Sequence, residues 1–296
     1  MIATLKLFRF PLVFTAIADS AAGYLLRCPG APDPLVLACL AAASAGLYMF
    51  GMAMNDIADR ERDRTLAPGR MLPSGRLTPA QAVSRSLAVI LVSAAAVIAL
   101  PGRSLAPLAV WGGTLLAILA YDFVLKAPPV MGLIRALNFL IGVASVPPPE
   151  NLYGLGSPLP GPYLALALTP FLYVTSLTFV STLEEGLVKR WVVMFGALFM
   201  AGAAFLPEFL VRRELGKHPA GASWAASAVL ACAVLARAAK AVDRKGVMFL
   251  VRDGVGGIIL LEAVTLLSAG LVGPGLAIAG LVVPAALSVA GFKKLA

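Results

Sequence analysis

Long apolar stretches, separated by short polar or Pro- and Gly-rich joints, run along the whole chain. A helix needs about 20 predominantly apolar residues to cross a bilayer. Stretches of about this length fall near residues 10–27, 35–54, 84–101, 105–125, 130–147, 162–182, 191–210, 222–239, 254–271 and 275–291. The last two are short and are separated by Gly273-Pro274-Gly275, so they form two helices or one broken helix. The pattern predicts an all-α fold, a polytopic transmembrane helical bundle of nine or ten helices.

The composition agrees with a membrane protein and excludes an ordinary soluble domain. The chain of 296 residues is 60% hydrophobic and 13% charged, whereas soluble domains average about 45–50% apolar and about 25% charged residues. No linker interrupts the apolar stretches, so we expect a single domain over residues 1–296, embedded in the lipid bilayer. The net charge of +9 comes without a basic stripe on a soluble module, so nucleic acid is not an expected partner.

The distribution of lysine and arginine predicts how the chain is oriented. Cytoplasmic loops of membrane proteins carry an excess of these residues. With a cytoplasmic N-terminus and ten spans, 18 of the 24 lysines and arginines fall on the cytoplasmic side and 5 on the other. The joints after the second, fourth, sixth and eighth stretches then share the cytoplasmic face. We expect a multi-pass protein of the inner (cytoplasmic) membrane whose N-terminus and active-site loops are cytoplasmic.

The joint after the second apolar stretch has the densest charge in the chain. It contains Asn55-Asp56-x-x-Asp59-x-x-x-Asp63 and then Arg70-Met71-Leu72-Pro73-Ser74-Gly75-Arg76. On a helix, Asp56, Asp59 and Asp63 fall within about 60° of one another. Three carboxylates on one face repel one another unless a cation lies between them, and oxygen ligands suit Mg²⁺. The alternative is a solvated helix end whose aspartates and arginines pair with each other.

This pattern resembles the first aspartate-rich motif of the UbiA-type intramembrane prenyltransferases. The likeness includes the spacing of the asparagine and the three aspartates and the Pro-Ser-Gly tail. It extends, in order and placement, over the first six apolar stretches. The resemblance implies that Asp56, Asp59 and Asp63 hold Mg²⁺ against an isoprenyl diphosphate. It also implies that the isoprenyl group passes to an electron-rich aromatic or alcohol acceptor within the membrane.

Two later positions add positive charge to the expected site. The segment Tyr121-Asp122-Phe123-Val124-Leu125-Lys126 resembles the Tyr-x-x-x-Leu-Lys element of the same family, whose lysine is a candidate diphosphate contact. Arg135 lies inside the fifth stretch, and ionisable residues there usually face an interior cavity. We expect Lys126 and Arg135 to be catalytic, because they would stabilise the charge of the leaving diphosphate. The expected diphosphate contacts are Asn55, Arg64, Arg70, Tyr121, Lys126 and Arg135.

Structural alternatives exist for these polar residues. Asp122 and Lys126 have the spacing of an i,i+4 helix pair. Both Lys126 and Arg135 lie near enough to the cytoplasmic end of a span to extend to the interface. Asn138 is expected to serve packing, and Asp19 in the first stretch is expected to make an interhelical hydrogen bond.

The chain departs from the family pattern after the sixth stretch. The resemblance implies a second aspartate-rich motif there, for a second Mg²⁺. The sequence instead reads Ser181-Thr182-Leu183-Glu184-Glu185-Gly186-Leu187-Val188-Lys189-Arg190, without an aspartate. Glu184 and Glu185 are the carboxylates of this segment, and we expect them to be the remaining metal ligands. The departure leaves three options, which are a single Mg²⁺, a glutamate-based second site and a loss of transferase activity.

The sequence therefore predicts an enzyme, a Mg²⁺-dependent prenyltransferase of isoprenoid biosynthesis. Its partners would be an isoprenyl diphosphate, an acceptor small molecule and, as an open option, proteins of the same pathway. A non-catalytic relative that binds a polyprenyl lipid is one alternative, and the missing second motif favours it. A secondary transporter is a weaker alternative, because transporters place ion sites near the bilayer midplane and these carboxylates cluster at one surface.

Overall fold

The structure is a computed structural model, and it describes residues 2–28, 30–102, 104–146, 159–184, 188–218 and 221–294. These residues form helices and connecting segments, without a strand. The elements in chain order are α1 (Ile2–Leu7), the 3₁₀ helix η1 (Phe10–Leu12), α2 (Val13–Arg27), α3 (Pro34–Ala58), α4 (Arg60–Leu66), α5 (Pro79–Ile98), α6 (Ala106–Phe123), α7 (Pro128–Ala144), α8 (Gly161–Leu166), α9 (Leu168–Ser181), the 3₁₀ helix η3 (Thr182–Glu184), α10 (Arg190–Leu215), α11 (Gly221–Ala239), α12 (Arg244–Ser268), α13 (Val272–Gly280) and α14 (Val282–Lys294).

The all-α polytopic bundle is confirmed. Within the described ranges, seven helical segments are long and apolar enough to cross a membrane, and they are α3, α5, α6, Gly161–Glu184, α10, α11 and Val272–Gly291. α7 is apolar but has 17 residues, and α2 has 15. α12 has 25 residues but contains several charged ones. The predicted stretches all fall on helices, while the count of nine or ten spans stays a prediction.

Prolines and capping side chains set where these helices begin. α3, α5 and α7 each have a proline in the first turn, where the missing N–H would have had no partner in any case. The Asp33 side chain accepts the N–H of Leu35 at 2.8 Å at the start of α3. Thr78 and Gln81 form a capping box at the start of α5, which satisfies two backbone donors.

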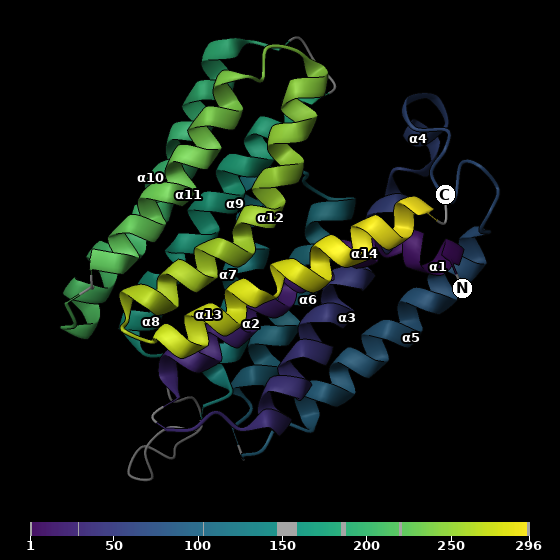
Figure 1. Cartoon of the computed structure of the whole chain (residues 1–296). Coiled ribbons are helices and arrows are strands. Elements are labelled where there is room, and N and C mark those ends of the chain that lie inside the picture. The colour runs from purple at the N-terminus through teal and green to yellow at the C-terminus, as the bar shows by residue number, and fades with distance from the viewer. Residues whose placement is uncertain are drawn as a thin grey trace.

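The helices form two groups that meet along α2 and α7 (Figure 1). α3, α5 and α6 share one apolar core with α2 and α7. α9, α10, α11 and α12 surround a second apolar core. The groups are joined because α7 packs on α9 and α2 packs on α12.

The α2–α7 contact is close because glycines lie in it. A Cβ on Gly142 would overlap the backbone oxygen of Ser20, and a Cβ on Gly23 would overlap that of Phe139. Small residues are the usual means by which helix backbones approach each other in membranes. The approach places polar side chains of α2 directly against those of α7.

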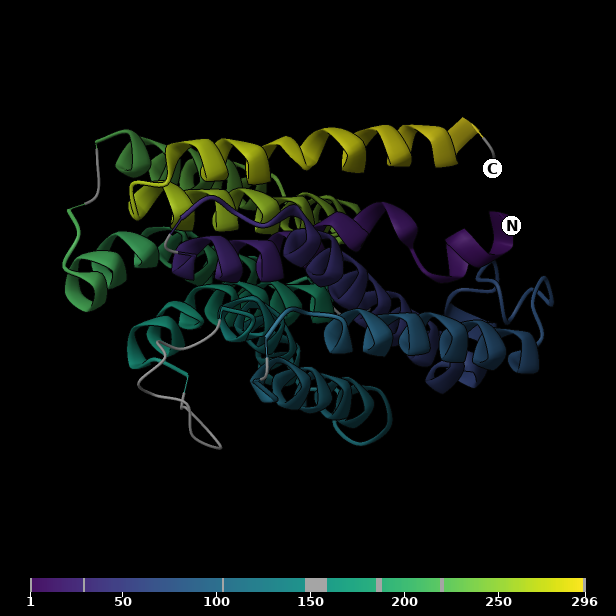
Figure 2. The same ribbon diagram turned by 90° about the horizontal axis from the view of Figure 1, so that it is seen from below.

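α13 and α14 lie on the outside of the bundle. They cross its front diagonally in Figure 1 and run along one edge in Figure 2. α13 packs on α12, and α14 contacts η1 and α2. Both chain ends therefore lie at the same end of the bundle, close to α4 (Figures 1 and 2).

We expect Gly142→Ala to lower the thermal stability of the detergent-solubilised protein. The added methyl group overpacks the α2–α7 contact, and overpacking typically costs about 1–3 kcal/mol. Gly202→Ala on α10 is the matched control, because its Cβ would meet nothing within 4 Å. Alanine favours a helix by roughly 1 kcal/mol over glycine, so the control should melt at or above the wild-type temperature. Equal melting temperatures for the two variants would contradict the close contact.

Candidate active site

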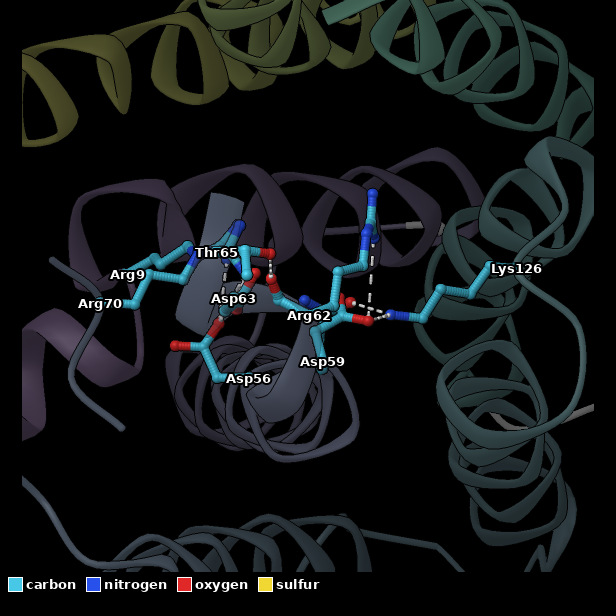
Figure 3. A network of polar contacts seen from close by, with 9 residues as sticks. Arg9, Asp56, Asp59, Arg62, Asp63, Thr65, Arg70 and Lys126 are labelled. Carbon is cyan, nitrogen blue, oxygen red and sulfur yellow. Dashed lines mark hydrogen bonds and ion pairs between the residues drawn. The ribbon is translucent and has the colours of Figure 1, made fainter. Parts of the chain in front are cut away.

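The aspartate-rich segment lies where α3 ends and α4 begins. The helix breaks at Asp59, which separates the two elements. The side chains of Asp56 and Asp63 are both 5% exposed, whereas that of Asp59 is 15% exposed. Asp59 is turned toward Lys126, whereas Asp56 and Asp63 form a buried pair turned toward Arg9 and Arg70 (Figure 3).

Two arginines from different parts of the chain hold this buried pair. Arg9, in the link between α1 and η1, places Nη2 3.1 Å from Oδ1 of Asp56. Arg70, in the loop after α4, places Nη1 3.7 Å from the same oxygen and pairs directly with Asp63. Figure 3 shows the two arginines approaching the aspartates from the same side. One guanidinium nitrogen of Arg70 thus lies between two carboxylates, so both face a common positive charge.

Lys126 reaches the segment from the side opposite the two arginines (Figure 3). It follows α6, forms an ion pair with Asp59 and donates from Nζ to Oδ1 of Asn55 at 3.2 Å. The ion pair joins the α3–α4 junction to the link between α6 and α7, and Lys126 also interacts electrostatically with Asp122. The structure thus brings Lys126 and Asn55 together at the aspartates.

Arg64 lies apart from the other expected diphosphate contacts. It pairs with Glu61 on α4, and its side chain is 57% exposed. The alternative of local pairing at a solvated helix end therefore describes Arg64. It does not describe Asp56, whose partner Arg9 is 47 positions away in the sequence.

A cavity adjoins the charged segment. It is lined by residues of α2, α3, α6 and α7, and most of its lining surface is apolar. Its polar lining residues are Ser44, Tyr48, Asn55, Thr114, Tyr121, Asp122, Arg135 and Asn138. Asn55 belongs both to this lining and to the Lys126 contact, so the cavity opens beside the cationic groups.

Arg135 and Asn138 are tied to α2 by a buried network. Arg135 Nη2 donates to the backbone oxygen of Thr15 at 2.7 Å and to Oδ1 of Asp19 at 3.0 Å. Asn138 Nδ2 donates to the backbone oxygen of Ala16 at 2.7 Å and to Oδ2 of Asp19 at 3.2 Å. The side chains of Asp19 and Arg135 are 0% and 8% exposed. Arg135 therefore holds the cavity wall through an ion pair, and any role toward the diphosphate remains a proposal.

The carboxylates expected at a second metal site are only partly described. Glu185 lies outside the described residues. Glu184 is partly buried at the end of η3 and interacts electrostatically with Arg9. In the part of the chain that the structure describes, no three His, Cys, Asp or Glu side chains are placed to hold a metal together. Neither the first motif nor the segment around Glu184 therefore presents three such ligands among the described residues.

A single Mg²⁺ does fit the first motif. Asp56 and Asp63 converge on one positive charge, now that of Arg70. Mg²⁺ is usually held by one or two carboxylates and completes its shell with water and phosphate oxygens. These two buried oxygen donors are therefore a suitable protein contribution to one ion.

Sequence reasoning missed Arg9 and counted it only as loop charge. Its backbone angles are φ 45° and ψ 45°. Every other described residue with a positive φ is a glycine. The left-handed conformation costs an L-residue roughly 1–2 kcal/mol. Strain of this kind tends to persist where function requires it. The sequence feature that could have pointed to Arg9 is its place beside Phe10-Pro11, directly before the first apolar stretch.

The sequence pattern of the UbiA prenyltransferase family matches residues 16–246. The chain belongs to this family. The resemblance drawn from the aspartate motif is thereby confirmed, and the protein is a multi-pass integral membrane protein.

Individual relatives agree with this membership. A digeranylgeranylglyceryl phosphate synthase from Methanothrix thermoacetophila is 32% identical over 164 residues, and the match spans 55% of this chain and about half, 55%, of the synthase. An apo structure of a UbiA homolog from Aeropyrum pernix K1 has a TM-score of 0.65 at 20% identity and covers 90% of this chain and 97% of its own. A UbiA homolog from Archaeoglobus fulgidus, solved with GPP and Mg²⁺ bound, has a TM-score of 0.58 at 13% identity and covers 94% of this chain and 99% of its own. These structures show the same fold.

We expect Asp19→Leu to destabilise this UbiA-family protein strongly. It leaves the buried guanidinium of Arg135 without its carboxylate, and breaking a buried pair typically costs about 3–5 kcal/mol. The double variant Asp19→Leu/Arg135→Met removes both charges and should recover much of the loss. Thermal unfolding of the wild type, both single variants and the double variant gives the coupling energy. A coupling near zero would contradict the structural role of the pair.

Proposed function

We propose that this UbiA-family protein transfers an isoprenyl group from a prenyl diphosphate to an acceptor within the membrane, with Mg²⁺. The observation that supports the proposal is a cluster of charges beside a cavity with a mostly apolar surface. The cluster consists of the buried carboxylates Asp56 and Asp63 and the cationic side chains Arg9, Arg70 and Lys126. A diphosphate needs positive charge, and an isoprenyl chain needs an apolar wall. The Archaeoglobus fulgidus homolog with GPP and Mg²⁺ supports the same pair of ligands.

Asp56 and Asp63 are the residues that would hold Mg²⁺, which would neutralise diphosphate oxygens and polarise the allylic C–O bond. Arg70 and Lys126 would donate charge-assisted hydrogen bonds to the diphosphate. Both cations lie within reach of the aspartates in the structure, so little movement is needed. They would stabilise the negative charge that builds on the leaving group.

The cavity would hold the isoprenyl chain and exclude water from the reacting carbon. Its wall includes the aliphatic residues Leu47, Ile118 and Ile134. Dry surroundings strengthen electrostatic interactions and prevent hydrolysis of a reactive carbocation. Arg135, held by Asp19, would contribute positive potential from the wall without leaving its ion pair.

We infer an alcohol on a glycerol phosphate as the acceptor class, with an aromatic acceptor as the alternative. The support is the relative named for a glyceryl phosphate that bears two geranylgeranyl groups. In such a transfer the allylic C–O bond breaks, and its electron pair leaves with pyrophosphate. The acceptor oxygen forms the new C–O bond and gives up its proton.

Asp122 would accept this proton. It is the carboxylate among the described lining residues of the cavity, and it is 7% exposed. It lies next to Tyr121 near the end of α6, and it interacts electrostatically with Lys126 in the link that follows. A general base must lie within reach of the acceptor oxygen, and a carboxylate in the cavity lining supports this assignment.

The proposed orientation places the aspartates, Lys126 and both chain ends on the cytoplasmic side. Its support is the excess of lysine and arginine in the joints on that side. A water-soluble diphosphate head would then enter from the cytoplasm, while its isoprenyl chain enters the bilayer-embedded cavity.

Purified protein with geranylgeranyl diphosphate, geranylgeranylglyceryl phosphate and Mg²⁺ should release pyrophosphate, measured by a coupled phosphate assay. Asp56→Asn and Asp63→Asn should each lower the rate at least tenfold, because each removes a charged ligand of a hard ion. Glu61→Gln, on the exposed side of α4, is the control and should be near wild type. Tight lipid binding without any pyrophosphate release would favour the non-catalytic relative.

Asp122→Asn should lower product formation at least tenfold, because the acceptor proton loses its base. Binding of geranylgeranyl S-thiolodiphosphate, an unreactive analogue, should change little, since Asp122 is not assigned to the diphosphate. Product formation is followed by mass spectrometry, and Asp253→Asn on the exposed part of α12 is the control. Wild-type product formation by Asp122→Asn would exclude the assigned role.

A further inference from the structure

Arg9 is held in a strained backbone conformation at the mouth of the site. Its φ of 45° is unusual for a residue with a side chain, and η1, which follows it, is packed against α14. This arrangement fixes the point from which the Arg9 side chain extends. The guanidinium then reaches Asp56, with 36% of the Arg9 side chain still exposed.

Arg9 also faces negative groups besides Asp56. It interacts electrostatically with Asp122 of the cavity lining and with Glu184 at the end of η3. Its positive charge therefore acts on carboxylates of α6 and η3 as well as on Asp56 of α3. A diphosphate bound at the buried aspartates would occupy the same region.

Two arginines and a divalent cation compete for the same carboxylate oxygens. Oδ1 of Asp56 lies 3.1 Å from Arg9 and 3.7 Å from Arg70, and Asp63 pairs with Arg70. A hard ion bound to these oxygens would take over the charge compensation that the arginines now provide. The guanidinium groups would then lose their acid partners beside a ligand that carries several negative charges.

We propose that Arg9 is a diphosphate-binding residue that exchanges partners, from Asp56 without metal to the diphosphate when metal is bound, together with Arg70. This inference rests on the proposed prenyl diphosphate site and adds a residue to it. The partly exposed side chain allows the guanidinium to turn while the strained backbone stays in place. Arginine suits the exchange because its planar fork matches phosphate oxygens as well as carboxylates.

The exchange predicts opposite effects of one substitution with and without metal. Asp56→Asn removes the acid that retains Arg9, so it should bind geranylgeranyl S-thiolodiphosphate severalfold more tightly than wild type in EDTA. With Mg²⁺, the same variant should bind at least tenfold more weakly, because it lacks a metal ligand. A purely structural Arg9–Asp56 pair would weaken binding in both conditions.

Binding by isothermal titration calorimetry tests this with four proteins in Mg²⁺ and in EDTA. They are wild type, Asp56→Asn, Arg9→Ala and the double variant. Arg9→Ala should weaken Mg²⁺-dependent binding at least tenfold, and the double variant should lose the gain that Asp56→Asn shows in EDTA. Arg213→Ala on α10, where the side chain is 84% exposed, is the control and should be unchanged.

Each result has one interpretation. Absence of the EDTA gain in Asp56→Asn, or normal Mg²⁺-dependent affinity of Arg9→Ala, would overturn the exchange. Failure of the wild type to bind the analogue with Mg²⁺ would instead overturn the proposed function. Arg9→Lys keeps a charge at this position and should retain part of the affinity, so it separates loss of charge from loss of fold if Arg9→Ala is unstable.

Discussion

Asp56 and Asp63 lose most of their contact with water where α3 meets α4, and ion pairs replace that hydration. A buried carboxylate without a positive partner is strongly unfavourable. Arg9 and Arg70 come from before the first long helix and from the loop after α4. The chain must therefore bring its N-terminal link and this loop to the end of α3. The same requirement creates a concentration of opposite charges at the mouth of a cavity.

The cavity depends in turn on how α2 and α7 meet. Glycines let the two backbones approach, and the approach allows Asp19 to pair with Arg135 within the wall. Ionisable residues inside membrane bundles usually mark function. Here the ion pair has a packing role that explains its burial, and an effect of Arg135 on the site is part of the proposed function. One interaction can therefore stabilise the fold and shape the chemistry.

The sequence predicted the long helices well because they are long apolar stretches, and hydropathy alone identifies such stretches. It also placed Lys126 and Asn55 at the aspartates through the family motif. It did not predict the break at Asp59, because propensity and spacing cannot show where a helix bends under tertiary contacts. Arg9 was missed for a similar reason. Its role depends on a left-handed backbone and on a partner 47 positions away.

Arg64, an expected diphosphate contact, forms an exposed pair with Glu61, so its role at the site stays a prediction. The segment after α9 adds a related argument. The carboxylate of that segment that the structure describes, Glu184, interacts electrostatically with Arg9. An arginine side chain stays charged at physiological pH, so its positive charge does not depend on carboxylates placed to bind a metal ion. If a single Mg²⁺ binds at the first motif, as we propose, side chains would supply the remaining positive charge, and Arg9 is a cation that the fold brings to this position.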